Sequence, residues 1–518
     1  MEAAEESSPL LATKDESPQS SSGSVTVHPV IPSSYQNGDS EDTVDGSGSS
    51  YREVSKREEE VPGQNINRAY PSRFWILGVF SFIAFFQCLQ WNTWGPISES
   101  VDAAFSGWKS STVAMMANWG TITFVLFITP MCWLMNEKGL RTGVFACAIM
   151  IAAGTVLRVL ALTTNSNEVF TISCHLCAIL VGTAGTLVMA APPMIAAEWF
   201  PPKERTTATA IGQAFNQLGN AGSYLEPIFV RSPADGTPEE IRGDIKVLMY
   251  AYAGIAAAVL LAVFFYYPSK PPTPPSLSSS VERLQFWDSI KKILRNRDVI
   301  IVTLAYGISV GIPSSWIAVF NYSLQAMNIH QDEATWIGLA VVIVSSTSAL
   351  VSGRLTDLVY GHLRVSLIII MLANLGCFYW FYLITYGSIT VVKWQIYFTS
   401  IAAFSLNFAT CPLFFELAVE SAYPCPEILV GGLLTGMNNF VGLLFLFLFF
   451  IPNIGYSWVT YVLLATSSLS IIPVILVRED YTRSTMDRFK GHQPAYKSIL
   501  QKDPLVQKVR QLTSIKIE

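Results

Sequence analysis

Apolar runs of roughly 18 to 30 residues recur about twelve times along this chain, and each is long enough to cross about 30 Å of hydrocarbon as a helix. Because 51% of the 518 residues are hydrophobic and 14% are charged, the composition excludes a water-soluble globular protein. The runs predict an all-α membrane protein with twelve transmembrane helices. The expected spans are 74–95, 112–135, 142–163, 170–197, 207–230, 247–267, 299–323, 334–356, 365–386, 394–419, 429–451 and 456–477.

The segments around these runs predict five regions. Residues 1–72 are rich in Ser, Glu, Asp and Gly and poor in aromatic residues, which favours a disordered tail. No apolar segment lies near Met1, so we expect no cleavable signal peptide and expect the first span to direct insertion. The other regions are two six-helix halves, a linker between them and a C-terminal tail, expected at 73–267, 299–478, 268–298 and 479–518.

Basic residues flank the spans unequally on the two sides of the membrane. Roughly seventeen Lys and Arg residues lie on the side of the N-terminus, against roughly five on the opposite side. This bias predicts that both termini are cytosolic. In the linker, the apolar residues at one helical face stand opposite basic residues, which is typical of a helix lying along the membrane surface. These apolar residues are Leu284, Trp287, Ile290 and Leu294.

Two pairs of loops repeat similar patterns in the two halves of the chain. Pro201 in "EWFPPKERTTATAIGQA" aligns with Pro424 in "ESAYPCPEILVGGLLTG", and the same alignment sets Glu204 on Glu427. A second pair is "MNEKGLR" and "GRLTDLVYGHLR". Such repeats favour a secondary transporter built from two related halves. Charge anchoring of tight basic loops is the alternative interpretation.

The second loop of that last pair resembles the Gly-x-x-x-Asp signature of the major facilitator superfamily. Gly353, Asp357 and Arg364 occupy the matching positions. The resemblance implies the major facilitator superfamily fold, with alternating access to a central site. We expect a gate at the cytosolic side formed by Glu204, Arg205, Asp357 and Arg364.

Four short sequence strings narrow the resemblance from the superfamily to a single family. "QWNTWGPI", "EWFPPKERTTATAI", "NQLG" and "FFELAVESAYPCPE", in this order, are together similar to solute carrier family 49, the family of the feline leukaemia virus subgroup C receptors. The resemblance implies a proton-driven transporter of the lysosomal membrane that carries pyridoxine (vitamin B6) from lumen to cytosol. Other members are associated with choline or haem. A membrane receptor or scaffold, whose helices only hold cytosolic tails, is the rival class.

One face of the first span is polar and aromatic. Gln87, Gln90, Trp91 and Trp94 recur at spacings of three and four, so they share a helix face that lipid does not favour. We expect Gln87, Gln90 and Trp91 to bind substrate in a central cavity; a tryptophan belt and hydrogen bonds between helices are the alternatives. Further candidates for substrate binding are Gln213, Asn216, Gln217, Tyr306, Trp316, Asn407 and Asn438.

Gln217 is the strongest of these candidates. It falls in "NQLG", which matches a substrate-contacting glutamine of the choline-carrying relatives that the resemblance implies. Those relatives have a tryptophan where this chain has Cys88, so an aromatic cage for a quaternary ammonium is not expected in the same form.

Ionisable residues within the spans are few. Glu416, Glu420 and Glu226 are candidates for proton coupling, because a buried carboxylate can accept a proton from an acidic compartment. The alternative is a structural cluster in which acids pair with Arg205, Arg354 or Arg364 at the gate. Arg158 is expected to extend to the lipid headgroups or to face Glu226.

Motifs of other functional classes are missing from the sequence. No Walker loop, metalloprotease helix or Ser-His-Asp arrangement is present, so neither a primary pump nor an enzyme is expected. His175 lies between Cys174 and Cys177 without a second pair of ligands, so we expect no metal and no cofactor. The expected partners are a small-molecule substrate, protons and the lipid bilayer, with no nucleic acid, and the chain is expected to be a monomer.

The N-terminal region carries a string that resembles an acidic-dileucine sorting signal. In "ESSPLL", Glu6 precedes Leu10 and Leu11. The resemblance implies recognition by clathrin adaptors and delivery to the lysosomal membrane. A chance occurrence of this short string is the alternative.

Overall fold

The computed structural model describes residues 68–108, 110–164, 166–280, 283–317, 331–358, 361–390, 392–448, 451, 457–479 and 481–488. The sorting string of Glu6, Leu10 and Leu11 lies outside the described residues. The elements are α1 (Ser72–Asn92), α2 (Ser98–Ala104), α3 (Ser110–Lys138), α4 (Leu140–Thr163), α5 (Asn167–Ala190), α6 (Pro192–Trp199), η2 (Pro202–Glu204), α7 (Arg205–Ser223), η3 (Glu226–Ile228), α8 (Pro238–Phe265), α9 (Leu277–Ser280), α10 (Phe286–Arg295), α11 (Arg297–Trp316), α13 (Gln331–Leu358), α14 (Leu363–Thr385), α15 (Lys393–Ala422), α16 (Glu427–Phe447), α17 (Ser457–Leu476) and α18 (Thr482–Arg488).

Each predicted span corresponds to a helix. Within the described residues, eleven helices are long and apolar enough to cross a membrane. The twelfth is α7, which has 19 residues and a polar stripe from "IGQAFNQLGN" that lowers its hydropathy. It packs between α1 and α13, so its polar side chains are shielded from lipid by neighbouring helices. The prediction of an all-α membrane protein with two six-helix halves is confirmed.

Three helix ends differ from the predicted spans. The predicted span 170–197 is broken into α5 and α6, because Pro192 has no N–H to continue the α5 ladder and instead opens a new helix. The predicted span 207–230 ends at Ser223, just before η3. α8 begins at Pro238 rather than at 247, because Thr237 and Glu240 form a capping box.

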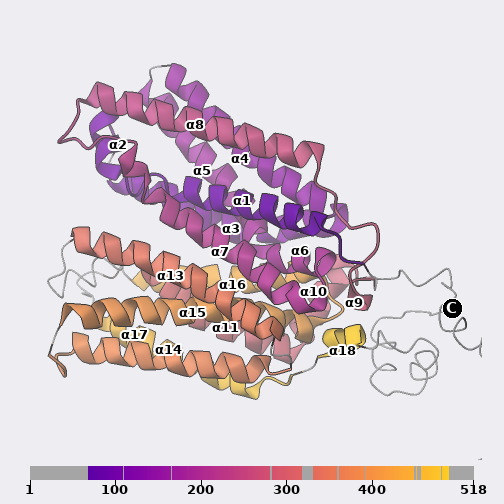
Figure 1. Ribbon diagram of the computed structural model, residues 1–518. Helices are drawn as coiled ribbons and strands as arrows, with labels where there is room; N and C mark the ends of the chain where they lie inside the picture. Colours follow the sequence, from indigo (N-terminus) through magenta and orange to yellow (C-terminus); the bar gives the residue numbers. More distant parts are fainter. Residues whose placement is uncertain are drawn as a thin grey trace, which may run out of the picture. The chain divides into compact units, whose positions relative to one another are not determined.

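The two halves lie beside each other as separate helix bundles (Figure 1), α1 to α8 in one and α11 to α17 in the other. The repeated loops have repeated contacts. Glu204 forms an ion pair at 3.1 Å with Arg73, which lies at the start of α1. Glu427 forms an ion pair at 2.6 Å with Arg283 of the linker. In both halves, therefore, the glutamate three residues after the aligned proline binds an arginine that lies in or before the first helix of that half.

Arg364 has a different place from the one expected. Its Nη1 donates to the carbonyl of Val477 at the end of α17, and its backbone N–H donates to Glu479, so it joins elements within the C-terminal half. Arg141 does the same in the N-terminal half, where it donates to the carbonyl of Phe264 at the end of α8. The prediction that Arg364 forms the gate is therefore wrong: arginines in this loop satisfy free carbonyls at a helix C-terminus.

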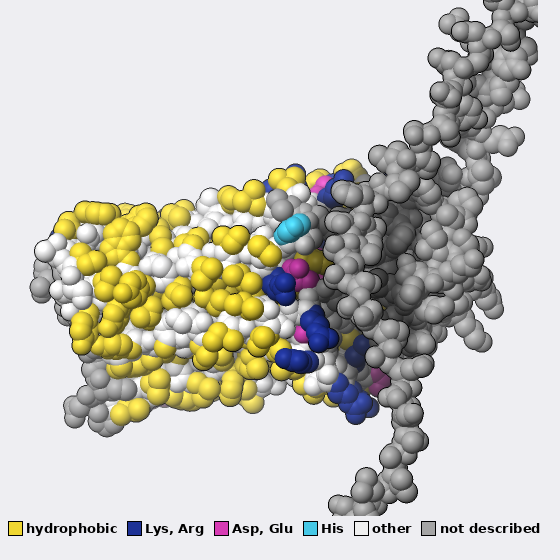
Figure 2. All heavy atoms as spheres, turned by 90° about the horizontal axis from the view of Figure 1, so that it is seen from below, with side chains coloured by type: hydrophobic (Ala, Val, Ile, Leu, Met, Phe, Trp, Pro, Cys, Tyr) yellow, Lys and Arg dark blue, Asp and Glu magenta, His cyan; other side chains and the backbone are white. Residues whose placement is uncertain are grey.

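The linker contains the expected amphipathic helix, α10. Trp287 and Leu294 are both 62% exposed, whereas Phe286 and Ile293 pack into the core. Leu284 precedes the helix rather than belonging to it. One apolar face of α10 is therefore fixed to the bundle, and a second is available to lipid. Figure 2 shows the wider pattern, with apolar side chains covering the helical region and charged side chains gathered at one end.

We call the end of the bundle that carries α6, α9 and α18 the α18 end, and the opposite end the α2 end. At the α18 end, helices of the two halves approach closely through glycines. A Cβ at Gly431 would lie 2.1 Å from the backbone oxygen of Ala190, and one at Gly353 would lie 2.7 Å from the Cβ of Ala210. In Figure 1 the two halves diverge from this end towards the α2 end.

Substitution of Gly431 by valine is expected to open the α18 end. The clash with Ala190 corresponds to overpacking that costs about 1–3 kcal/mol, so the labelling rate of the buried Cys132 thiol between α3 and α16 should rise by about fivefold or more. A membrane-permeant maleimide with peptide mass spectrometry measures this rate. Gly436→Val is the matched control, because a Cβ at Gly436 meets nothing within 4 Å. Equal labelling rates of Cys132 in the two variants would contradict the close approach of the two halves at the α18 end.

Candidate functional site: a central cavity and a closed end

A central cavity of about 60 Å³ lies between the two halves. α5, α6 and α7 line it from the N-terminal half, and α11, α13, α15 and α16 line it from the C-terminal half. Five of the predicted substrate-binding residues line this cavity, namely Gln213, Asn216, Gln217, Tyr306 and Asn438. Because both halves contribute to the lining, a relative motion of the halves would change access to whatever the cavity holds.

The cavity combines aromatic rings with unpartnered amides. Tyr306 packs edge-on against Phe415 at a ring distance of 5.6 Å, and Phe408 lines the same space. The side-chain oxygens of Gln213 and Asn438 are buried and have no hydrogen-bond partner among the residues that the structure describes. Buried polar atoms are rarely left in this state, so these two oxygens are suited to accept hydrogen bonds from a bound molecule.

α7 supplies the polar wall of the cavity. Gln213 and Gln217 are four residues apart, so they lie on one face of the helix. Asn216 lines the cavity too, but its amide donates to the carbonyl of Ala84 on α1 at 3.1 Å. Asn216 therefore holds α7 against α1, and Gln213 and Gln217 are the amides of α7 with groups left for a ligand.

The other five predicted residues lie outside the central cavity, and three of them line neither that cavity nor the one described next. Trp316 is 1% exposed and stacks on Phe404 at a ring distance of 5.2 Å, inside the C-terminal half. Asn407 donates to the carbonyl of Ser309 at 2.7 Å. Gln87 is 1% exposed and donates to the carbonyl of Val181. For all three, packing or bonding between helices replaces the expected contact with substrate.

Gln90 and Trp91 line a different space, which we call the side cavity. It has about 10 Å³, room for one small ion or water, and lies within the N-terminal half, between α1, α3, α4 and α5. The indole N–H of Trp91 donates to the carbonyl of Ala117, and Trp94 is 3% exposed. Arg158 also lines this cavity and is 1% exposed. The predictions that the polar face of the first span lines the central cavity and that Arg158 extends to the headgroups are therefore wrong.

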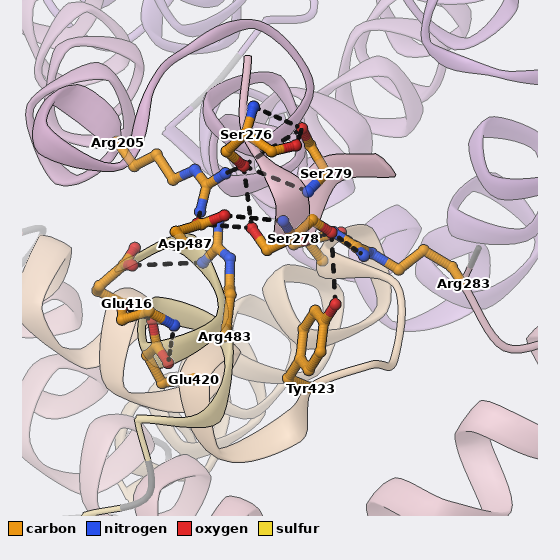
Figure 3. Close-up of polar contacts among 12 residues, drawn as sticks. Arg205, Ser276, Ser278, Ser279, Arg283, Glu416, Glu420, Tyr423, Arg483 and Asp487 are labelled. Atoms are coloured by element: carbon orange, nitrogen blue, oxygen red, sulfur yellow. Dashed lines mark hydrogen bonds and ion pairs between the residues drawn. The ribbon is translucent and has the colours of Figure 1, made fainter. Parts of the chain in front are cut away.

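The α18 end is closed by ion pairs that join both halves, the linker and α18 (Figure 3). Arg205 of α7 pairs with Asp487 of α18 at 2.9 Å, and Asp487 also accepts the backbone N–H and the hydroxyl of Ser278. From the same helix, Arg483 pairs with Glu416 of α15 at 3.3 Å. α18 therefore cross-links elements that are far apart in the sequence.

Arg483 stays positively charged although it is buried. Burial alone would lower the pKa of this guanidinium, but the nearby carboxylates of Glu416, Glu427 and Glu420 outweigh burial, so that the pKa is raised. Ser484, next in sequence, donates to Glu420 through its hydroxyl and its backbone N–H. Both predicted proton-coupling acids of α15 are thus bound by α18 in this conformation.

Asp357 closes the α18 end directly between the halves. Its carboxylate accepts the backbone N–H groups of Thr206 and Thr207 at 3.0 and 2.7 Å, and the hydroxyl of Thr207 at 2.6 Å. The carboxylate of α13 thus caps the N-terminus of α7, where free N–H groups and the helix dipole favour negative charge. Of the four predicted gate residues, Arg205 and Asp357 bridge separate parts of the chain at this end. Glu204 pairs with Arg73 inside the N-terminal half.

Sequence reasoning missed Arg483 and Asp487. They lie beyond the last apolar run, and Asp487 is separated from its partner Arg205 by 282 residues. Their spacing of four places them on one face of a helix, which is the one signal in the tail that could have identified them.

Glu226, the third acid predicted to couple protons, lies away from the α18 end. It is 3% exposed and accepts hydrogen bonds from Thr93 and Tyr252 through one oxygen. Its other oxygen has no hydrogen-bond partner within the described part of the chain. Glu226 joins η3 to α1 and α8 inside the N-terminal half.

Comparison with known proteins agrees with this architecture. The family model described as Major Facilitator Superfamily matches residues 80–446. Among solved structures, the E. coli fucose:proton symporter FucP is similar with a TM-score of 0.60 at 14% identity, covering 79% of this chain and 99% of that chain. A variant of XylE is similar with a TM-score of 0.61 at 12% identity, covering 80% of this chain and 98% of that chain. The fold is that of a transport protein, not of an enzyme.

Relatives in sequence define the family. A Xenopus laevis protein named solute carrier family 49 member 4 homolog is 32% identical over 440 residues, which cover 82% of this chain and 95% of the relative. The Danio rerio choline/ethanolamine transporter flvcr2b is 27% identical over 420 residues, which cover 79% of this chain and 84% of the relative. The chain belongs to solute carrier family 49 of the major facilitator superfamily.

Proposed function

We propose that this transporter carries a small organic metabolite, with pyridoxine favoured, from the lysosomal lumen to the cytosol by alternating access and together with protons. The central cavity carries this proposal. The unpartnered oxygens of Gln213 and Asn438 accept hydrogen bonds from hydroxyl groups, and the rings of Tyr306, Phe408 and Phe415 offer surfaces to a planar ring. A small aromatic ring that bears several hydroxyls matches both features.

The residues that line the central cavity also discriminate between the candidate substrates. Haem carries two carboxylates, and among the described residues no Lys or Arg lines the central cavity to bind them. Choline or ethanolamine is the second candidate, because relatives such as flvcr2b carry that name and a cation can rest on an aromatic face. No carboxylate lines the described part of the cavity, so a cation would depend on the aromatic rings and the amide oxygens alone.

Ligand-induced stabilisation of the purified protein tests the substrate. Pyridoxine is expected to raise the unfolding temperature in a saturable manner, because a ligand that binds the folded state stabilises it. Choline, ethanolamine and haem are measured in parallel. Stabilisation by choline alone would replace pyridoxine with the second candidate, and a lack of stabilisation by all of them, combined with a lack of uptake, would favour the receptor or scaffold class.

Proton coupling follows from the position of Glu416. It is next to Phe415, which lines the central cavity, and it pairs with Arg483 at the closed α18 end. A proton that reaches Glu416 neutralises it and weakens this ion pair. Protonation would therefore loosen the closed end from the opposite side of the membrane, so that the α18 end opens after substrate and proton have entered. Glu420, bound by Ser484, adds a second acid to this cluster.

Glu416→Gln is expected to flatten the pH dependence of transport. In the unchanged protein, uptake should rise as the substrate side is acidified, because protonation of Glu416 promotes opening; glutamine imitates the neutral form at every pH. Uptake into proteoliposomes at a series of external pH values measures this. Glu198→Gln is the matched control, since Glu198 pairs at 3.7 Å with the exposed Lys270 instead of α18. An unaltered pH profile in Glu416→Gln would exclude this residue as the coupling site.

The location of the protein in the lysosomal membrane is part of the same proposal. The start of α1 and α18 lie at the same end of the bundle, which accords with two termini on one side, and the bias in basic residues favours the cytosol for that side. Clathrin adaptors in the cytosol would then reach the dileucine string of the N-terminal tail.

Leu10→Ala combined with Leu11→Ala is expected to move the protein from lysosomes to the plasma membrane. Fluorescence microscopy with a lysosomal marker, together with surface biotinylation, measures the shift. The control is the paired change Leu505→Ala and Val506→Ala in the C-terminal tail, which leaves the string intact. If the variant with Leu10→Ala and Leu11→Ala stays in lysosomes, the sorting signal lies elsewhere in the chain.

A further inference from the structure

The side cavity is separate from the central cavity, and the two share none of the residues that line them. It is enclosed by helices of the N-terminal half alone. The proposed function uses none of its residues. What it could hold is therefore a question independent of the transported substrate.

A buried positive charge lines this cavity. Arg158 is 1% exposed, its Nη2 donates to the side-chain oxygen of Gln90 at 2.5 Å, and its guanidinium lies over the ring of Trp94 at 5.7 Å. The Nε of Arg158 is buried without a hydrogen-bond partner. Among the described residues no ion pair to Arg158 is found, although a buried charge without a counter-charge is strongly unfavourable.

One acid acts on Arg158 without contacting it. Glu226 interacts electrostatically with Arg158, but one of its oxygens accepts from Thr93 and Tyr252, and no ion pair joins the two side chains. Glu226 balances the charge at a distance, and the Nε of Arg158 is left without an acceptor among the described residues.

The amide of Gln90 adds a second free donor. Its oxygen accepts from both the hydroxyl of Thr155 at 3.1 Å and the guanidinium of Arg158. Since both partners are donors, the orientation of the amide is fixed, with the oxygen towards them and the NH₂ group away. That NH₂ group is buried and has no partner. Gln90 itself is 4% exposed and lines the side cavity.

Two carbonyls at or beside this cavity are already occupied. The carbonyl of Val181 accepts from Gln87, and the carbonyl of Ala117, next to the lining residue Met116, accepts from Trp91. A water molecule needs acceptors for its own protons, whereas an anion needs donors only. The free groups at this cavity, the Nε–H of a guanidinium and an amide NH₂, are donors, and they match an anion.

We propose that the side cavity binds one small inorganic anion of the size of chloride, held by Arg158 and Gln90. The ion accepts from the free N–H groups of Arg158 and Gln90 and joins α1 to α4 at the place where Trp91 packs against Gly120 of α3. It is a structural ligand of the N-terminal half, not a transported substrate.

Thermal unfolding of the purified full-length protein tests this site. The protein is prepared in sodium gluconate, and chloride replaces gluconate at constant ionic strength. Chloride is expected to raise the unfolding temperature in a saturable way by about 2 to 5 °C, and bromide should act similarly. An equal unfolding temperature in gluconate and chloride would overturn the proposal and leave a cavity that holds water only.

Two variants assign the effect to this cavity. Arg158→Met should abolish the response to chloride. Gln90→Glu places a carboxylate against Arg158 as a built-in anion, so this variant should fold in gluconate and gain nothing from chloride, even if Arg158→Met fails to fold. Arg231→Met is the control, because Arg231 is 48% exposed and should retain the full response. A chloride response that persists in Gln90→Glu would overturn the assignment to the side cavity.

Discussion

Replacement of Gln217 by alanine should lower the transport rate by about tenfold or more while leaving the fold intact. Gln217 lines the central cavity on the same face of α7 as Gln213, and it is not among the residues that join the helices by a described hydrogen bond. Loss of a hydrogen bond to a buried ligand group costs about 1–3 kcal/mol, which corresponds to about 5- to 150-fold in binding. Initial rates of uptake, with protein amount and unfolding temperature recorded for each variant, measure this effect.

Phe215→Ala is the matched control for Gln217→Ala. Phe215 lies on the same helix but is 38% exposed and absent from the cavity lining. Its replacement changes more side-chain volume than Gln217→Ala does, yet it should leave the transport rate near that of the unchanged protein. Similar losses in both variants would mean that α7 tolerates no change, and a normal rate in Gln217→Ala would remove this residue from the substrate site.

The second large effect is expected from Asp357→Ala. The carboxylate of Asp357 accepts three hydrogen bonds from Thr206 and Thr207 across the two halves. Each hydrogen bond to a charged group contributes about 1.5–3 kcal/mol, so losing the set favours an open α18 end by at least about thirtyfold. Cys132 reports on this opening, because its thiol is 2% exposed and faces the carbonyl of Ile428 across the same interface.

Labelling by a membrane-permeant maleimide should therefore be much faster at Cys132 in Asp357→Ala. Cys147 is the internal reference, since it is 1% exposed and packs inside the N-terminal half against the carbonyl of Ala184. Asp298→Ala is the control variant, because Asp298 accepts the N–H of Arg478 within the C-terminal half. Faster labelling at both cysteines would indicate unfolding, and unchanged labelling at both would show that Asp357 does not hold this end closed.

The fold could be predicted from the sequence because its determinants are local. A run of apolar residues of membrane length has to form a helix in lipid, and the repeat around Pro201 and Pro424 reveals two related halves. Even the polar α7 could be placed, since it stands between two such runs. The helix boundaries at Pro192 and Thr237 are harder to predict from sequence, because capping depends on single residues.

The candidate site could be predicted only in part. Polarity on a helix face indicates contact with other polar groups, but it does not tell whether these belong to a cavity or to a neighbouring helix. Gln217 and Asn438 line the central cavity, whereas Asn407 bonds to a backbone carbonyl and Gln90 lines the side cavity. Which outcome holds depends on how the helices are rotated against one another, and a single sequence contains little information on that rotation.

Ion pairs between distant segments were the least predictable feature. The alternative to proton coupling pairs the acids of the spans with Arg205, Arg354 or Arg364. In the structure, Glu416 instead binds Arg483 of α18, and Arg205 binds Asp487 of the same short helix. Charged residues are compatible with many partners in a linear sequence, and only the folded chain selects among them.

Uptake by purified protein in proteoliposomes is the measurement that tests the central claim most directly. Vesicles are loaded at pH 7.5 and placed in buffer at pH 5.5 or 7.5 with radiolabelled pyridoxine, and Gln217→Ala serves as the inactive counterpart. Saturable uptake that is faster at pH 5.5, falls when the pH gradient is dissipated and is largely lost in Gln217→Ala is the predicted result. Uptake equal to that of protein-free vesicles at both pH values would contradict the account.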